Sequence, residues 1–474
     1  MIEDADFLDQ LAAVDDNSAC AVQHARMIWR LAPPIGPLTA AIAHDIGDLG
    51  RNAVQFDGVT TGGTRWTGRI DAADRVMARG FDRLAAAGDL LDADVVYGDD
   101  LTRTGDGVRL RLKPAFDPVL LARRDYIGRA ALIRRAALEP DELASLKGPG
   151  GLVQIMRQKH TLRVAHLPFP VLLAAGEPEP PPARAQAITA PQPKISIIIP
   201  NRNSPDLIRM VTEGLRTITD YPDLEIIIVD NGSDDPATLA HYQALEDDPN
   251  VTVLIQPEPF NFAAMVNRGA AAATGDALLL LNNDVEMQNG DWLGHMVACL
   301  AEPEVGIVGA KLLFPDGTIQ HAGVTIGHGG VAGHVFKGAA ADSDDALHRL
   351  TTPHGREAVT AAAMLIRRKI WDDLGGFDER AFPVAFNDVD FCLRAGAAGW
   401  YVAMAPDAVL IHHEGASRGG FSPTRFLRHQ RERTMLRLRH RTIGHVDRFS
   451  SPWHDPASLT PRFRMLKRLP EARF

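Results

Sequence analysis

Residues 277–285 read Ala277-Leu278-Leu279-Leu280-Leu281-Asn282-Asn283-Asp284-Val285, an apolar run that ends abruptly in two amides and a carboxylate. Such a run predicts a strand buried on both faces, as in the middle of a parallel sheet. Ligands bind these sheets at the carboxyl ends of the strands. Asp284 would offer a hard oxygen ligand to a divalent cation there. A simple turn after the strand is the alternative interpretation.

The segments on either side repeat this pattern. Residues 194–200 form a predicted strand that ends at Pro200, and residues 224–230 form a second that closes on Asp230. A short strand is expected at 251–254. Ser204-Pro205-Asp206 has the order of a helix start, and residues 261–273 are typical of an alanine-rich helix. This order of elements predicts a right-handed, mostly parallel α/β sheet.

Three of these strands end in polar residues, at 201–203, 230–233 and 282–284. In a parallel sheet these ends lie at one edge. Asp230 could accept hydrogen bonds from a base or ribose, or it could close an Asx turn. Neither GxGxxG nor a Walker lysine loop follows the first strand, which argues against a dinucleotide or P-loop site. The polar strand ends fit a nucleotide-sugar site, in which carboxylates and a cation hold the ligand, better than either of these sites.

Composition narrows the class of protein further. The chain has 474 residues, 45% of them hydrophobic, and a formal net charge of −10, which argues against nucleic acid as a partner. Three widely spaced cysteines give no disulfide framework or CxxC metal site. The first residues are acidic, and no apolar run approaches the roughly 20 residues of a membrane span. We therefore expect a cytoplasmic protein, at most peripheral on the inner face of the membrane.

Proline and charge patterns divide the chain into four parts. Residues 177–193 are proline-rich and predict an extended linker. They separate an N-terminal domain at 1–176 from a main domain at 194–420. A basic helical extension at 421–474 follows, with an arginine-rich helix expected at 424–441. Its charges predict a solvated face paired with acidic neighbours, and contact with an anionic membrane is the alternative.

The main domain resembles glycosyltransferase family 2, which has the GT-A fold, a mixed α/β sheet with flanking helices. The matching motifs are Ile197-Ile-Ile-Pro200-Asn-Arg-Asn203, Ile227-Ile-Val-Asp230-Asn-Gly-Ser233, Asn282-Asn-Asp284, Gly375-Gly-Phe-Asp378, Asn387-Asp388-Val-Asp390 and His412-His413. Residues 309–323 and 386–394 resemble the rhamnosyltransferase-like, polysaccharide-building branch. The resemblance implies an inverting, metal-dependent hexosyltransferase in surface polysaccharide assembly. The donor would be UDP- or dTDP-linked, and the acceptor a glycan or a lipid-linked sugar.

The resemblance also assigns roles to single residues. Residues 282–284 occupy the place of the family's DxD motif, with Asn282 in place of its first Asp. It implies that Asp284 and His412 ligate Mg²⁺ or Mn²⁺. The remaining donor-site residues that it implies are Pro200, Asn203, Asp230, Asn282 and Asn283. Alternation along the strand should direct only one of His412 and His413 into the site.

Asp388 matches the family's general base, with Asn387 in place of the preceding Glu. Such a base takes a proton from the acceptor hydroxyl as that oxygen attacks the anomeric carbon. A helix N-cap is the structural alternative for Asp388. Asp390 and Arg394 are four residues apart, which predicts an intrahelical ion pair. Histidines 321, 328 and 334, in a glycine-rich segment, are expected to be mostly solvated.

The N-terminal domain resembles the same fold more weakly, in residues 69–76, 93–100 and 116–134. Ala73 takes the place of the second DxD carboxylate, and residues 153–159 replace the acidic pair. We expect a degenerate GT-A-like module, with an unrelated α/β domain as the alternative. For the whole chain, a catalytically dead scaffold on the transferase fold is the main rival. A sugar-phosphate nucleotidyltransferase is less favoured, because the loop after the first strand lacks glycine.

Overall fold

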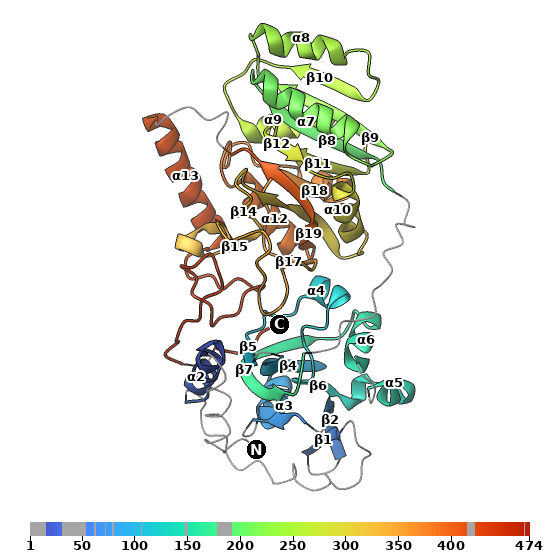
Figure 1. Ribbon diagram of the computed structural model, residues 1–474, viewed down its shortest axis with the longest axis vertical. Helices are drawn as coiled ribbons and strands as arrows, with labels where there is room; N and C mark the ends of the chain where they lie inside the picture. The colour runs from blue at the N-terminus through green and yellow to red at the C-terminus, as the bar shows by residue number, and fades with distance from the viewer. Residues whose placement is uncertain are drawn as a thin grey trace.

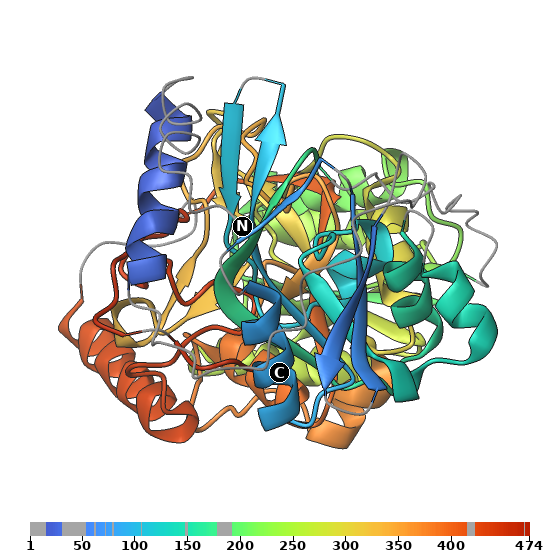
Figure 2. The same cartoon turned by 90° about the horizontal axis from the view of Figure 1, so that it is seen from below.

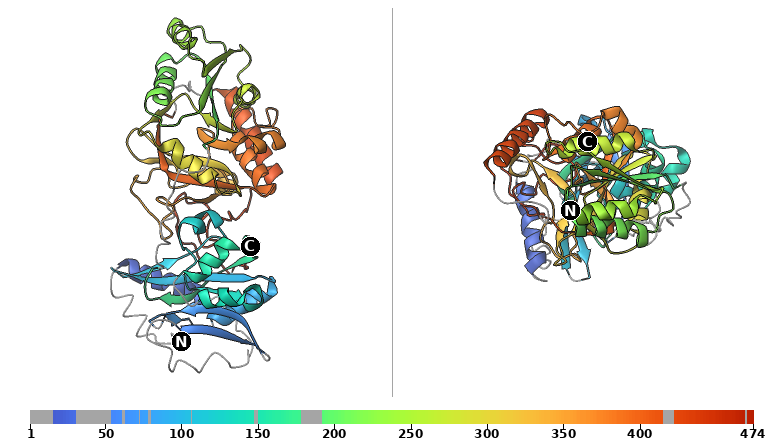
Figure 3. Two further views of the ribbon diagram at one scale, coloured as in Figure 1. Left: turned by 90° about the vertical axis from the view of Figure 1, so that its right-hand side faces the viewer. Right: turned by 90° about the horizontal axis from the view of Figure 1, so that it is seen from above.

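The computed structural model describes residues 16–30, 54–60, 63–71, 73–77, 80–105, 107–146, 150–177, 192–414, 422–468 and 470–474. The molecule is elongated, with one sheet above the other (Figure 1 and Figure 3, left). Most of the predicted proline-rich linker, residues 178–191, lies outside the described residues. Among the described helices, none is both long and apolar enough to cross a membrane.

The upper sheet contains the 277–285 segment and is mixed. Its order is β10-β9-β8-β11-β18-β13-β19-β12, with β14 paired to β13 and β17 to β19. The strands are β8 (Ile195–Asn201), β9 (Leu224–Asp230), β10 (Val251–Ile255), β11 (Ala277–Leu281), β12 (Val285–Met287), β13 (Val305–Leu313), β14 (Ile319–His321), β17 (His354–Arg356), β18 (Ala363–Arg367) and β19 (Tyr401–His412). Strands β10, β9, β8 and β11 are parallel, and β13 is parallel to β19. Strand β18 runs antiparallel to both β11 and β13. The predicted α/β class with a mixed sheet is confirmed.

Helices cover both faces of this sheet. The helices are α7 (Pro205–Thr217), α8 (Pro236–Leu245), α9 (Phe262–Ala272), α10 (Trp292–Leu300), α11 (Arg368–Leu374) and α12 (Asn387–Ala397). Along β8, Ile197 and Ile199 pack with α7, α8 and α10, whereas Ile198 packs in the core that contains α9, α11 and α12. Burial on both faces explains why the central strands are continuous apolar runs. Helix α8, between β9 and β10, was not predicted.

The lower sheet belongs to the N-terminal part. Its order is β1-β2-β6-β4-β7-β3, with β5 paired to β4. The elements are α2 (Asp16–Arg30), β1 (Val54–Thr60), β2 (Gly63–Ile70), β3 (Arg75–Val76), α3 (Gly80–Leu90), β4 (Val95–Thr104), β5 (Gly107–Arg111), α4 (Pro118–Arg123), β6 (Ala131–Arg134), η1 (Arg135–Ala137), α5 (Pro140–Ser145), α6 (Gly151–Gln158) and β7 (Val164–Ala174). Figure 2 shows this sheet from below, with α2 along one side.

The two sheets share a topology. The order β2-β6-β4-β7-β3 in the lower sheet corresponds to β11-β18-β13-β19-β12 in the upper sheet. Each corresponding pair of neighbours also has the same sense, parallel between β4 and β7 and antiparallel for the others. The hairpin β4–β5 corresponds to β13–β14, and α3 corresponds to α10. The N-terminal sheet thus repeats the second half of the upper sheet, and its described residues contain no counterpart of the parallel strands β8, β9 and β10.

The C-terminal residues connect the two sheets. Helix α13 (Pro423–His440) confirms the predicted arginine-rich helix and lies beside the upper sheet (Figure 1). The chain beyond it has no further helix among the described residues. Its Trp453 side chain is fully buried and donates from Nε1 to the Pro168 carbonyl at 2.9 Å. Arg473 forms a backbone bridge to His166 in β7. This segment therefore packs against the N-terminal sheet as part of the fold.

Candidate active site

The ends of three parallel strands meet through a chain of hydrogen bonds. Asn283, after β11, donates from Nδ2 to Oδ1 of Asn201 at 2.6 Å. Asn201, at the end of β8, donates from its own Nδ2 to the Tyr242 hydroxyl at 2.7 Å. That hydroxyl donates to Oδ2 of Asp230, the last residue of β9, at 2.7 Å. The predicted gathering of the three strand ends at one edge is therefore seen in the structure.

Asp230 closes an Asx turn, as its structural alternative predicted. Its Oδ1 accepts from the Ser233 backbone nitrogen at 2.7 Å, and its Oδ2 also contacts the Ser233 hydroxyl. The side chain is fully buried. Asn203, which has a left-handed φ of 52°, ties the two loops together by accepting from the nitrogens of Asp234 and Asp235 at 3.0 and 3.1 Å. Pro200 precedes this loop and is half-buried. The bonds of Asp230 and Asn203 fix the shape of the loops at this edge.

His412, the last residue of β19, faces Asp284. Its Nε2 lies 3.0 Å from Oδ1 of Asp284 and 3.2 Å from Nδ2 of Asn282. The side chains of His412 and Asp284 are each about 7% exposed. His413 points the other way and contacts Glu286 at 2.9 Å. The predicted alternation is confirmed, and it brings His412 to Asp284.

Gln320 orients the His412 ring. Its Nε2 donates to Glu414 at 3.1 Å, so its Oε1, 3.0 Å from His412 Nδ1, must accept. Nδ1 therefore carries a hydrogen, and the Nε2 lone pair of a neutral ring points at the Asp284 carboxylate. Two acceptors facing each other require a proton or a cation between them. A hydrogen-bond partner at the second ring nitrogen, which fixes the tautomer as Gln320 does here, is usual for a metal-ligating histidine.

This donor set fits a divalent cation. A carboxylate oxygen and an imidazole nitrogen suit Mn²⁺ or Mg²⁺. Among the described residues, no group of three His, Cys, Asp or Glu side chains could hold a metal ion. A cation at Asp284 and His412 would therefore take its other ligands from a bound diphosphate and water, as Mg²⁺ does in many phosphate sites.

Asp388 lies in the first turn of α12 and is half-buried. Its Oδ2 accepts from the Ala361 nitrogen at 3.1 Å, and its Oδ1 from the Val389 nitrogen at 2.8 Å. The N-cap is Phe386, so the N-cap alternative for Asp388 is wrong. Ala361 adjoins Ala362, whose carbonyl accepts from the Asn282 nitrogen at 3.0 Å. The chain just before β18 thus links the two parts of the site: Ala361 contacts Asp388, and Ala362 contacts Asn282.

A pair of histidines lies beside this segment. His321 and His334 approach to 2.8 Å between their Nδ1 atoms, and His321 Nε2 accepts from the Thr360 nitrogen at 3.4 Å. His321 is fully buried, so the expectation that it is solvated is wrong. Burial and the nearby His334 hold the pKa of His321 well below its ordinary value. Burial also lowers the pKa of His334, so the neutral form is favoured for both rings.

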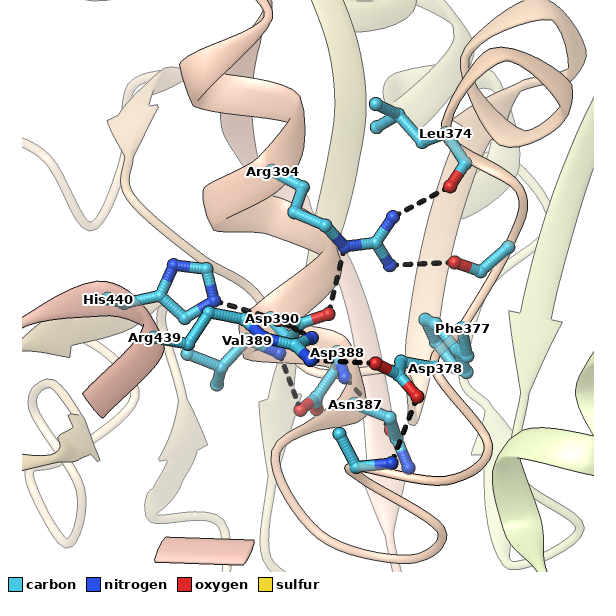
Figure 4. Close-up of polar contacts among 12 residues, drawn as sticks. Leu374, Phe377, Asp378, Asn387, Asp388, Val389, Asp390, Arg394, Arg439 and His440 are labelled. Atoms are coloured by element: carbon cyan, nitrogen blue, oxygen red, sulfur yellow. Dashed lines mark hydrogen bonds and ion pairs between the residues drawn. The ribbon is translucent and has the colours of Figure 1, made fainter. Parts of the chain in front are cut away.

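Asp390 has a structural role (Figure 4). Its carboxylate is fully buried and accepts from Arg394 at 2.9 Å, from Arg439 at 3.0 Å and from His440 at 2.8 Å. Burial raises the Asp390 pKa, but the bond from His440 and the Arg394 charge outweigh it, so the pKa lies below its usual range. Arg439 also bonds Asp378 at 2.8 Å. The predicted pair with Arg394 is confirmed, and the network fastens α13 to α12.

Part of the chain matches a known protein family. Residues 196–373 match the model of glycosyl transferase family 2. This matched region is referred to as the family 2 domain. The match covers β8 to α11, which includes Asp230 and Asp284, and ends before Asp388 and His412.

Several curated proteins are similar to parts of the chain. An uncharacterized protein, y4gI of Sinorhizobium fredii, is 40% identical over 63% of this chain and 32% of its own length. The O-antigen biosynthesis protein RfbC of Myxococcus xanthus is 42% identical over 48% of this chain and 18% of its own. The N-acetylglucosaminyl-diphospho-decaprenol L-rhamnosyltransferase of Mycobacterium tuberculosis is 28% identical over 52% of this chain and 83% of its own. The chain thus spans a third or less of the first two relatives.

Solved structures also resemble part of the chain. The mannosyltransferase PcManGT from Pyrobaculum calidifontis, in complex with GDP-Man and Mn²⁺, is 19% identical. The match covers 52% of this chain and 70% of that one, with a TM-score of 0.36. TarS of Staphylococcus aureus with UDP-GlcNAc is 20% identical over 49% and 63%, also with a TM-score of 0.36.

Proposed function

We propose that the protein is an inverting glycosyltransferase that moves a sugar from a nucleotide diphosphate to a hydroxyl of a glycan or lipid-linked acceptor in surface polysaccharide assembly. The observation that carries this proposal is the meeting of Asp284 and His412, 128 residues apart, beside the strand ends of a family 2 domain. The names of the O-antigen and rhamnosyltransferase relatives support the polysaccharide context.

The strand ends provide a site for the nucleotide. The bonds among Asn283, Asn201, Tyr242 and Asp230 fix the loops after β8, β9 and β11. Asp230 is fully buried, so its contribution to nucleotide binding would be to hold these loops in shape through its bonds to Ser233 and Tyr242. Pro200 and Asn203 would border this pocket, and Asn282 would face the diphosphate. A UDP- or dTDP-linked donor is the proposal.

Asp284 and His412 would hold Mg²⁺ or Mn²⁺. When bound there, the cation would stabilise the negative charge that develops on the leaving diphosphate. His412 is kept in the ligating tautomer by Gln320. The substitution of Asn282 for the first DxD carboxylate lowers the negative charge of the site.

Asp388 would be the general base. Backbone nitrogens of Ala361 and Val389 hold its carboxylate in place. An acceptor hydroxyl bound within hydrogen-bond reach would give its proton to Asp388 as its oxygen forms the bond to the anomeric carbon. The bond from that carbon to the diphosphate breaks on the opposite face, which inverts the configuration.

The N-terminal sheet would be a degenerate copy of the same fold, without transfer activity. Asp74 directly precedes β3 as Asp284 directly precedes β12, so Asp74 is a closer counterpart than Ala73. Arg129 binds both oxygens of Asp74, at 2.6 and 2.8 Å. The Arg129 guanidinium thus occupies the place that a metal cation would need. Peripheral membrane contact of the basic extension, on the inner face, remains a proposal.

A screen of nucleotide sugars for Mn²⁺-dependent release of the nucleoside diphosphate tests the proposal. We expect release from at least one UDP- or dTDP-sugar, faster when an acceptor glycan is added. A protein that binds these donors with Mn²⁺ but never turns them over would support the scaffold alternative instead.

A further inference from the structure

A cavity of about 410 Å³ lies outside the candidate active site, between the upper sheet and the C-terminal segment. One wall is the hairpin of β15 (Val324–Ile326) and β16 (Ala332–His334), with the 3₁₀ turn η2 (His328–Gly330) between them. The opposite wall is formed by residues in the range 443–464. A volume of this size accommodates a small molecule and not only an ion.

Arg356, at the end of β17, is the distinctive residue of this cavity. It lines the cavity and is 2% exposed. Its Nε and Nη2 are buried without a hydrogen-bond partner in the part of the chain that the structure describes. No carboxylate among those residues lies within ion-pair distance of it. A buried guanidinium normally has such partners, because leaving a buried charge unpaired is costly.

The position of Arg356 is fixed by the backbone around it. Gly323, with φ of 103°, packs so closely that an added Cβ would lie 2.7 Å from Arg356 Cγ and 2.8 Å from its Nε. Any other residue at 323 would displace the Arg356 stem. Burial and the charge of Arg349 lower the pKa of Arg356 to about 10, so it is still charged at neutral pH. The fold therefore holds a charged guanidinium here, with the nearby carboxylates of Asp447, Asp345 and Asp117 acting on it without a direct ion pair.

Two further arginines line the same cavity. Arg464 has a buried Nε without a partner among the described residues, and Arg349 is paired with Asp345 at 2.6 Å. The two lining carboxylates are already engaged by backbone nitrogens: Asp447 accepts from Ile326 and Phe449, and Asp455 accepts from Ala457. The cavity thus presents two arginines whose hydrogen-bonding groups are not used within the described fold.

We propose that this cavity binds the phosphate group of a sugar-sized ligand, with Arg356 and Arg464 as its anchors. Planar guanidinium groups match phosphate oxygens in charge and geometry. The ligand could be a soluble sugar phosphate or the phosphate head group of a lipid, since both carry this chemistry. The proposal goes beyond the transfer reaction and does not depend on it.

A chain of residue contacts links one wall of the cavity to the candidate active site. The β15–β16 hairpin that forms its wall carries His334, which contacts His321 at 2.8 Å. His321 in turn accepts from Thr360, next to the Ala361 that holds Asp388. A phosphate ligand in the cavity would therefore stabilise the hairpin that begins this chain of contacts.

Thermal unfolding with added phosphate compounds tests the proposal. The full-length protein is titrated, in excess EDTA and at constant ionic strength, with inorganic phosphate, glucose 1-phosphate or neutral glucose. We expect glucose 1-phosphate to raise Tm by about 3 °C at a hundredfold excess over Kd, inorganic phosphate to raise it less, and glucose to leave it unchanged. In Arg356→Met and Arg464→Met this rise should be lost. Exposed Arg468 provides the matched control, because Arg468→Met should keep the full response.

The variants can be interpreted without any assay of transfer. Arg356→Met removes an unpaired buried charge, so its Tm without phosphate should equal or exceed that of the natural protein. Co-sedimentation with vesicles that contain phosphatidic acid distinguishes the two sources. If the ligand is a lipid head group, the protein should bind the vesicles and Arg356→Met should abolish that binding. If the ligand is a soluble sugar phosphate, no such binding is expected. An equal phosphate response in Arg356→Met and the natural protein, or no response in the natural protein, would overturn the proposal.

Discussion

His412 Nε2 lies 3.0 Å from Asp284 Oδ1, while Nδ1 on the other side of the ring lies 3.0 Å from Gln320 Oε1. The two residues end β19 and precede β12, neighbouring strands that run antiparallel, with Val285 opposite His412. Sheet register therefore brings together two side chains 128 positions apart in sequence. This pair is the basis of the cation site proposed for the family 2 domain.

The first prediction compares two adjacent histidines. His412→Gln should weaken Mn²⁺-dependent nucleotide binding at least about tenfold, because it removes a nitrogen ligand. His413→Gln is the control, since His413 contacts Glu286 on the other face and should have little effect. Calorimetry with UDP or dTDP, with and without Mn²⁺, measures both. Equal losses in the two variants would contradict the assignment of His412.

The second prediction concerns the residue behind His412. Gln320→Leu removes the acceptor that fixes the His412 tautomer and should weaken Mn²⁺ affinity by about 10- to 100-fold. Nucleotide affinity without metal should not change, because Gln320 contacts none of the residues at the ends of β8 and β9 in the hydrogen bonds described above. A variant with unaltered Mn²⁺ affinity would show that ring orientation is set by other contacts.

The third prediction separates two neighbouring aspartates of α12. Asp388→Asn should lower kcat by about 10²- to 10⁴-fold and leave donor affinity and Tm nearly unchanged. Asp390→Asn should instead destabilise the fold by about 2 kcal/mol, because it weakens charge-assisted bonds to Arg394, Arg439 and His440. Turnover and thermal unfolding of both variants make the comparison. Full turnover in Asp388→Asn would remove it from the mechanism.

The fourth prediction follows from the pKa of His445. The hydrogen bond with Glu357, at 2.7 Å, raises this pKa, although burial opposes the rise. A raised folded-state pKa means that the pair stabilises the fold fully below the unfolded value of about 6.5. The contribution is lost as pH rises through the higher folded-state pKa. The Tm difference between the natural protein and His445→Gln should therefore be largest near pH 6 and shrink toward pH 9, and a difference that grows with pH would contradict this.

Much of the parallel part of the sheet could be predicted from sequence. Strands β8, β9 and β11 are continuous apolar runs because both faces are covered, and each ends at the polar residues that build the site. Helix α9 also begins as expected, with Asn261 accepting from the Ala264 nitrogen. Alternation along β19 correctly placed His412 and His413 on opposite faces.

Other parts of the site depend on tertiary contacts that local patterns do not encode. Tyr242 lies on α8, whose apolar residues do not mark a single face clearly, and its hydroxyl reaches Asp230 only once that helix has packed. Gln320 lies on the short strand β14, and its role depends on pairing with β13 and proximity to β19. The burial of His321 could not be predicted, because its glycine-rich surroundings are typical of an exposed loop.

The most direct test is a crystal structure of the protein soaked with Mn²⁺ and a donor nucleotide, with anomalous scattering used to locate the metal. The account predicts one strong peak about 2 Å from Asp284 and from His412 Nε2, bridged to the diphosphate, with Asp388 facing the sugar. A metal peak away from this pair, or a nucleotide bound away from the ends of β8, β9 and β11, would contradict it.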